Sequence, residues 1–257
     1  MNKLEKNLGG YCGELIDIRV LLEQIKSTAA SRGWTKEVFY SEDGLDLMAL
    51  HRKSHAPRRK IYISAGIHGD EPAGPSAILR LIKESSWPSD TEIFMCPCLN
   101  PIGFLHNKRE NPQGLDLNRQ YKDTEAREVQ AHKEWLSRQP AFDVCLCLHE
   151  DWESKGFYLY QLNPHGGISH AEQMIQEVSK VCPIDLSTEI EGRPAVGGII
   201  QPIADPKERP LWPEAIYLIA HKTRQNYTLE APSDFELPVR VNALVSAVRA
   251  VLDAQVY

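Results

Sequence analysis

The alternation of apolar and polar positions divides the chain into a short amphipathic start and a longer part in which strands and helices take turns. Within residues 12–31 apolar side chains recur at helical spacing, which predicts an amphipathic helix that ends near Gly33. Residues 36–53 contain two β-rich runs on either side of a polar turn at 41–44, which predicts a hairpin. We expect residues 1–55 to lead into the core.

Beyond residue 55, runs rich in β-branched and aromatic residues alternate with helical patterns. The expected strands are 61–65, 92–96, 143–148, 156–161 and 227–230, and the expected helices are 75–84, 124–138, 169–181 and 237–252. Near-continuous apolar strands between helices predict an α/β fold, with a mixed and mostly parallel twisted sheet and helices on both faces. We expect a single domain over residues 1–257. In such sheets, ligands bind beyond the carboxyl ends of the strands.

The composition and net charge limit the classes of partner that the protein can have. The chain has 257 residues, of which 42% are hydrophobic, enough for one sizeable core. Its 29 basic and 35 acidic residues give a net charge of −6, so it has no general attraction to nucleic acid or to an anionic membrane. We therefore expect neither as a partner. A basic stretch at 51–60 is expected to be solvated at the end of the hairpin.

The cysteines and the N-terminal sequence indicate the cellular compartment of the protein. The chain has six cysteines and no C-x-x-C motif, which favours small buried thiols in a reducing compartment. The first residues are polar and carry no signal-peptide pattern, and no run is long enough to span a membrane. These features predict a cytoplasmic protein, and they leave the oligomeric state open.

Candidate chemistry lies at the ends of the predicted strands. His68-Gly-Asp-Glu71 follows the apolar run 61–66, and a His and a carboxylate at this spacing can bind one metal ion. His149 and Glu230 come at the ends of two later strands. Catalytic zinc prefers three nitrogen or oxygen ligands and one open position, which two imidazoles and a carboxylate provide. A second carboxylate must then move the proton, and Glu230 is the natural candidate.

The polar loop 100–121 supplies further candidates. Arg109 in this loop could stabilise an oxyanion that develops on a metal-bound carbonyl. Arg119, with Asn118 beside it, could hold a substrate carboxylate. The alternative is that these arginines belong to a solvated loop.

Together these residues resemble the zinc metallocarboxypeptidases, the carboxypeptidase A-like family, to which the aspartoacylase and succinylglutamate desuccinylase branch is related. The shared motifs, in chain order, are His68-x-x-Glu71, Asn100-Pro-x-Gly103, Arg109, Asp116-x-Asn118-Arg119, His149 and Glu230. Residues 228–241 and the closing helix are similar to the bacterial cytosolic carboxypeptidase-like branch. The resemblance covers about residues 60–250, and it implies one zinc ion. By this resemblance, His68, Glu71 and His149 would bind the zinc ion, and Glu230 would act as general base and acid. Arg109 would stabilise the oxyanion, and Asn118 and Arg119 would bind the substrate carboxylate. Asp116 would form a hydrogen bond to His68.

The resemblance implies a carboxypeptidase that removes the C-terminal residue of a peptide. A zinc-dependent N-acyl-amino-acid amidohydrolase is the alternative, because both substrates carry a free carboxylate. A non-catalytic binding protein of the same fold is the third hypothesis.

Three features depart from the family pattern or stay open. The substrate-capping tyrosine is not evident, with Tyr217 and Tyr227 as candidates. Residues 150–153 are expected to form an acidic rim or a solvated loop. A second metal also stays open, because Asp70, Glu150 and Asp151 lie near the expected ligands in the sequence.

Overall fold

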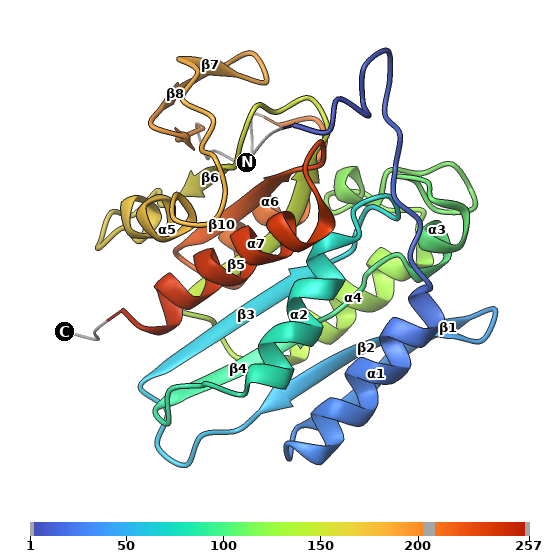
Figure 1. The fold of residues 1–257 in the computed structure, drawn as a ribbon. Coiled ribbons are helices and arrows are strands. Elements are labelled where there is room, and N and C mark those ends of the chain that lie inside the picture. The colour runs from blue at the N-terminus through green and yellow to red at the C-terminus, as the bar shows by residue number, and fades with distance from the viewer. Residues whose placement is uncertain (1–2, 203–208, 255–257) are drawn as a thin grey trace.

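The computed structural model describes residues 3–202 and 209–254, which form one mixed sheet covered by helices (Figure 1). The strands are β1 (Thr35–Glu42), β2 (Leu45–Arg52), β3 (Arg59–Ala65), β4 (Thr91–Cys96), β5 (Val144–Asp151), β6 (Tyr158–Leu162), β7 (Glu189–Ile190), β8 (Arg193–Val196), β9 (Ile199–Ile200) and β10 (Asn226–Pro232). The helices are α1 (Ile18–Ser31), α2 (Ala73–Glu84), α3 (Pro101–His106), α4 (Arg127–Arg138), α5 (Ala171–Val178), α6 (Glu214–His221) and α7 (Leu237–Leu252), with the short 3-10 turn η1 (Leu117–Arg119).

The ten described strands are ordered β1-β2-β4-β3-β5-β10-β6-β9-β8-β7. The centre, β4-β3-β5-β10, is parallel. On one side β2 pairs antiparallel with β4 and β1, and on the other side β6 pairs antiparallel with β10 and parallel with β9. The predicted α/β fold with a mixed sheet is confirmed. The parallel centre matters for function, because its carboxyl ends meet at one edge of the sheet.

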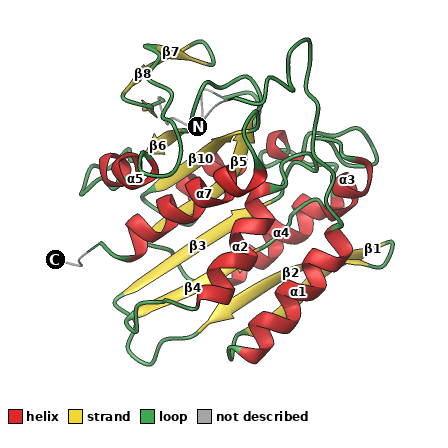
Figure 2. Ribbon diagram, viewed as in Figure 1, coloured by secondary structure: helices red, strands yellow, loops and turns green. Residues whose placement is uncertain are grey.

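Helices cover both faces of the sheet, as expected (Figure 2). Apolar side chains of α1, α2, α5 and α7 share one core with the strands, and those of α4 and α6 share a second core on the other face. Successive residues of a strand point to opposite faces, so Ile61 and Ile63 enter the first core while Tyr62 enters the second. Both faces of the central strands are therefore buried, which is why they read as continuous apolar runs. None of the described helices combines the length and the hydropathy needed to cross a bilayer.

The start of the chain differs from the prediction. Helix α1 begins at Ile18 rather than near residue 12, because the Asp17 side chain caps it by accepting a hydrogen bond from the Val20 N–H. The preceding residues follow an extended path, and Leu15 is exposed rather than part of the helix face. In that path the Tyr11 hydroxyl donates to the Asp70 carbonyl oxygen. The N-terminal segment thus contacts the turn that follows β3.

Several elements extend or add to the predicted ones. Strand β5 continues to Asp151 and β10 to Pro232, because the two strands stay paired in parallel to their ends. Helix α3 interrupts the expected loop 100–121, and α6 and the small strands β7–β9 were not predicted. As a result, His149 lies inside β5 rather than just after the strand, and Glu230 lies inside β10 rather than at its last residue.

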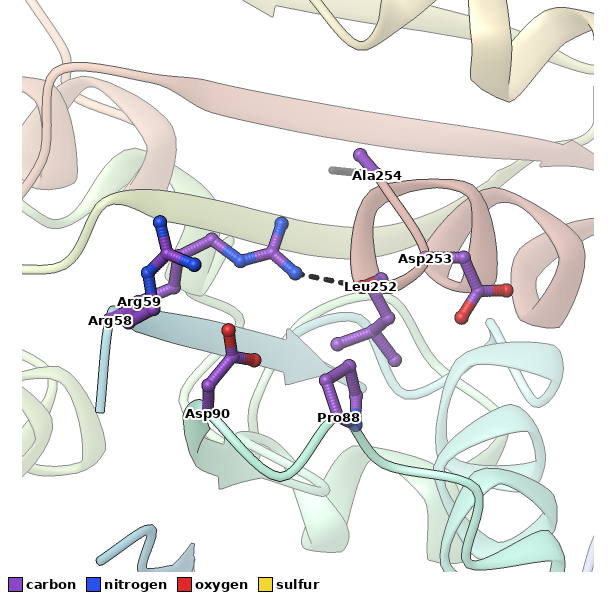
Figure 3. A pocket seen from close by; sticks show the side chains of 7 residues that line it. All are labelled: Arg58, Arg59, Pro88, Asp90, Leu252, Asp253 and Ala254. Carbon is purple, nitrogen blue, oxygen red and sulfur yellow. Dashed lines mark hydrogen bonds between the residues drawn. The ribbon is translucent and has the colours of Figure 1, made fainter. Parts of the chain in front are cut away.

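The basic stretch at 51–60 is only partly solvated. Arg59 is buried, and its guanidinium donates to the carbonyl oxygens of Val251 and Leu252 at 3.0 and 2.7 Å, so it caps the end of α7 (Figure 3). This cap lies at the amino end of β3, at the edge of the sheet opposite to the one where the candidate site lies. The expectation of a fully solvated basic stretch is wrong for this residue. All six cysteines are free, and Cys12 alone among them is exposed.

Candidate active site

His68, Glu71 and His149 converge at the carboxyl edge of the parallel strands. His68 and Glu71 lie on the turn between β3 and α2, and His149 lies near the end of the neighbouring strand β5. One ligand atom from each side chain lies within 4.8 Å of the others, and all three residues are buried. Within residues 3–202 and 209–254, no other group of histidine, cysteine or acidic side chains has this geometry.

The two imidazoles turn the same nitrogen toward the Glu71 carboxylate. The Nδ1 atoms of His68 and His149 lie 2.5 and 3.0 Å from Oε1 and Oε2 of Glu71. Burial raises the pKa of Glu71, but the attraction to His68 and His149 outweighs this effect and leaves the pKa below its usual range. Two imidazole nitrogens and an ionised carboxylate, held together inside the protein, are a donor set that suits zinc.

Asp116 holds the far side of His68. Its Oδ1 lies 3.3 Å from Nε2 of His68, and its Oδ2 accepts a hydrogen bond of 3.1 Å from Nε of Arg109. Burial raises the pKa of Asp116, yet its bond to His68 and the charges of His68 and Arg109 bring the pKa below its usual range. An ionised Asp116 favours the tautomer with the proton on Nε2, which leaves the Nδ1 lone pair free to bind a metal.

Glycines allow the turn after β3 to pack against the loop before Arg109. A Cβ added to Gly69 would lie 2.2 Å from the Gly103 carbonyl carbon, so only glycine fits there. Asn100 accepts a hydrogen bond from the Gly103 N–H and donates to the carbonyl oxygen of Arg109. The Gly69 N–H donates to that same carbonyl oxygen. The motifs His-Gly-Asp-Glu and Asn-Pro-x-Gly are thus packed together, and Arg109 is held beside the ligand cluster.

Glu230 lies beside His149. The two residues are partners in the parallel register of β10 and β5, and both line the same pocket of about 530 Å³. Burial, together with the negative charge of Glu71, raises the pKa of Glu230 well above its ordinary value, although part of its side chain stays open to the pocket. A divalent cation bound at the cluster would oppose this shift, because it would add a positive charge near Glu230.

Asn118 and Arg119 lie on another wall of this pocket. The Oδ1 of Asn118 accepts a hydrogen bond of 2.9 Å from the backbone N–H of Glu214, at the start of α6, so the side-chain NH₂ is its remaining polar group. Arg119 donates to the carbonyl oxygen of Asn118 at 2.9 Å. The predicted residues that line the pocket are His68, Glu71, Arg109, Asn118, Arg119, His149 and Glu230. Asp116 completes the predicted set through its bonds to His68 and Arg109.

The structure does not support either candidate for a substrate-capping tyrosine. Tyr227 is buried on the opposite face of β10 from Glu230, where its hydroxyl accepts the His170 N–H. Tyr217 packs against Tyr121 and His221 and is not among the pocket residues. Tyr160 does line the pocket, and its hydroxyl donates to Glu191. The alternation of side chains along the predicted strand 156–161 is the sequence signal that could have found it.

The expectation of an acidic rim or solvated loop at 150–153 is wrong for its first half. Glu150 is buried in an ion pair with Arg240, and Asp151 is buried where it accepts a hydrogen bond from the Tyr158 hydroxyl. Neither joins the ligand cluster, and nor does Asp70. All four residues border the pocket, and Trp152 and Glu153 are the exposed ones among them.

Part of the pocket comes from segments that carry no recognisable motif. These residues lie on β6, on α6 and its approach, and on the hairpin of β7 and β8 at the edge of the sheet: Leu162, Glu191, Arg193, Pro213, Ala215 and Ile216. Nothing in their sequence pattern marks them, because they reach the pocket only through the sheet order.

Part of the chain is similar in sequence to known proteins. The succinylglutamate desuccinylase/aspartoacylase catalytic domain matches residues 57–183. Carboxypeptidase SOL1 of Arabidopsis thaliana is 35% identical over 71 residues, a match that covers 22% of this chain and only 14% of that protein.

Solved structures share the fold. A candidate metallopeptidase from Shewanella amazonensis SB2B superposes with a TM-score of 0.80 at 21% identity, covering 92% of both chains. A metallo-carboxypeptidase from Burkholderia cenocepacia has a TM-score of 0.70 at 15% identity, covering 90% of this chain and 67% of that one. A metallo-carboxypeptidase from Pseudomonas aeruginosa, in complex with (2-guanidinoethylmercapto)succinic acid, has a TM-score of 0.65 at 19% identity, covering 90% and 68%.

Proposed function

Because the chain belongs to the carboxypeptidase-like family of metallohydrolases that is related to aspartoacylase, we propose that it is a zinc-dependent carboxypeptidase. It would hydrolyse the C-terminal peptide bond of its substrate. The observation that carries the proposal is the single pocket in which the cluster of His68, Glu71 and His149 lies together with Glu230 and Arg119.

We assign one zinc ion to His68, Glu71 and His149. The converging Nδ1 atoms and the ionised carboxylate support this assignment. When bound, the metal supplies a Lewis acid that lowers the pKa of a water molecule and polarises the substrate carbonyl. Asp116 keeps His68 in the tautomer that can bind.

Glu230 is assigned the proton transfer. Its carboxylate shares the pocket with the ligand cluster, and its backbone is fixed by pairing with β5. It would take a proton from the attacking water and give it to the leaving nitrogen. Arg109, held by Asp116, offers its guanidinium to the oxyanion that develops on the substrate carbonyl.

Asn118 and Arg119 are assigned the terminal carboxylate of the substrate. An arginine recognises a carboxylate through paired, charge-assisted hydrogen bonds. The P. aeruginosa metallo-carboxypeptidase of the same fold was solved with a succinic acid derivative, which supports a carboxylate-bearing ligand here. A cytoplasmic location stays a prediction.

A zinc-dependent N-acyl-amino-acid amidohydrolase is the second candidate. The match to the succinylglutamate desuccinylase/aspartoacylase catalytic domain favours it. We rank it second because the exposed Trp152 and Glu153 also line the pocket, and a longer acyl side such as a peptide could contact them.

An assay of paired substrates tests the proposal. The zinc-loaded protein is given N-blocked dipeptides and N-acyl amino acids, each also as the C-terminal amide, which lacks the carboxylate. We expect hydrolysis of the dipeptides with a free carboxylate and none of their amides. Hydrolysis of the acyl amino acids alone would select the second candidate, and equal hydrolysis of acids and amides would contradict the role of Arg119.

A further inference from the structure

Behind the candidate site lies a buried ion pair to which the sequence motifs assign no role. Glu150 directly follows His149 on β5, and its Oε2 accepts a hydrogen bond of 2.6 Å from Nη1 of Arg240 on α7. Both side chains are completely excluded from solvent. A lone buried charge is very unfavourable, so each of these groups depends on the other.

The Glu150 carboxylate also bonds to the two other segments that carry the site. Its Oε1 accepts the backbone N–H of Ala73 at 2.5 Å, just after Glu71 at the start of α2. Its Oε2 accepts a hydrogen bond of 3.3 Å from the hydroxyl of Ser233, on the loop that continues from Glu230. One carboxylate therefore links β5, the turn with His68 and Glu71, and the end of β10.

Arg240 extends this network to the N-terminal segment. Its second terminal nitrogen is bonded to Glu14, which lies in the extended path before α1. In the same path the Tyr11 hydroxyl donates to the carbonyl oxygen of Asp70, between His68 and Glu71. The N-terminal segment is thus attached to the turn that carries two of the candidate ligands.

We propose that Glu150 and Arg240 are positioning residues for the metal site. They act through His149 and through the turn of His68 and Glu71, whose relative position sets how well the three ligand atoms converge. The inference rests on the proposed function, because it assumes that these atoms bind a metal. It goes further by giving a role to an ion pair whose two side chains are excluded from solvent.

The bonding pattern requires a carboxylate at position 150. Both of its oxygens accept hydrogen bonds, one from Ala73 and the other from Arg240 and Ser233. A glutamine has a single acceptor oxygen, so its NH₂ group would face a donor on one side or the other. Glu150→Gln would therefore separate β5 from α2 or from α7, without changing the size of the side chain.

Zinc affinity, measured by competition with a chromogenic chelator, tests the inference without any need for activity. The variants are Glu150→Gln and Arg240→Met. The matched control is Arg59→Met, which also removes a buried arginine bonded to α7, but at the opposite end of that helix. We expect the first two variants to bind zinc about 10- to 100-fold more weakly, as is typical when groups behind a metal ligand are removed. The control should lower the melting temperature and leave zinc affinity as in the wild type.

Two further variants keep the test decisive if a buried variant fails to fold. Arg240→Lys retains the charge and should recover part of the zinc affinity lost in Arg240→Met. Ser233→Ala removes only the weakest bond to Glu150 and should cause a small but measurable loss.

The possible results separate the two proposals. A wild-type protein that binds no zinc contradicts the proposed function itself. A wild type that binds zinc, with Glu150→Gln, Arg240→Met and Ser233→Ala binding it equally well, contradicts the positioning role alone. In that case the pair contributes to stability only.

Discussion

Glu230 lies directly beside His149 in the parallel register of β10 and β5. The two residues are far apart in the sequence, yet adjacent strands in a sheet are separated by only about 4.8 Å. Because partners in a parallel register direct their side chains to the same face, the candidate proton-transfer group and a candidate metal ligand open into one pocket. The strand pairing, rather than a flexible loop, fixes this distance.

Glu230→Gln should abolish turnover and spare metal binding. The amide keeps the size of the side chain but cannot take a proton, so we expect kcat to fall by about 10²- to 10⁴-fold. Zinc content and melting temperature should match the wild type. Glu153→Gln, which removes an exposed carboxylate of the same pocket, is the control and should keep most of the activity. Normal turnover by Glu230→Gln would refute the assignment.

Arg119→Met should weaken substrate binding more than it slows catalysis. A hydrogen bond to a charged group contributes about 1.5–3 kcal/mol, so we expect KM to rise by about 10- to 100-fold with a smaller change in kcat. Arg119→Lys should lie in between, because lysine keeps the charge but not the paired geometry. Steady-state kinetics on a blocked dipeptide would measure this. Arg193→Met, at the same pocket, serves as the control, and an equal rise in KM for both variants would mean that Arg119 has no special role.

Gly69→Ala should damage both stability and the metal site. The new methyl group would lie 2.2 Å from the Gly103 backbone, so the turn that carries His68 and Glu71 must move. We expect a loss of about 1–3 kcal/mol in the free energy of unfolding, together with weaker zinc binding. Gly74→Ala is the comparison, since its nearest neighbour would be a methyl group at 3.1 Å, and it should be tolerated better. Denaturant unfolding of both variants would decide, and a wild-type result for Gly69→Ala would contradict the close packing.

Glu214→Gln should change how stability depends on pH. Burial raises the pKa of Glu214 from 4.5 to about 7, against the opposing effect of hydrogen bonds from Ser64 and Tyr62. The folded carboxyl therefore holds its proton between pH about 4.5 and 7, where the unfolded one has lost it, so stability falls as the pH rises through this window. A shift of this size corresponds to about 3 kcal/mol.

Glutamine cannot ionise, so the variant should lack this part of the decline. Urea unfolding of both metal-free proteins at pH 5 and pH 8 would measure it. The metal-free state removes the pH dependence of metal binding from the comparison. Parallel pH profiles for the wild type and Glu214→Gln would show that Glu214 is not the group responsible.

Much of the site could be read from the sequence, because its chemistry is local. His68 and Glu71 fall on one short turn, and Asp116, Asn118 and Arg119 fall on another. His149 and Glu230 end apolar runs that can only be buried strands. A parallel sheet brings such strand ends to one edge, so the fold class was enough to group these residues.

The walls of the substrate pocket and the surroundings of the site could not be predicted from the sequence. Tyr227 appeared to be a pocket residue, yet strand alternation turns it into the core away from Glu230. Glu150 appeared to be exposed, and it is buried because Arg240, far along the chain, packs against it. Such contacts depend on long-range packing, which no local pattern records.

The sequence by itself determined the central strands, the main helices between them and the residue types gathered at the carboxyl edge of the sheet, because hydrophobic periodicity and strand ends are local properties of the chain. Only the tertiary structure decided which of these residues share a pocket, which acidic groups are neutralised in the interior, and which walls a substrate meets. Those outcomes depend on the pairing of β5 with β10 and on the packing of α6 and α7 against the sheet, which join residues that are distant in sequence.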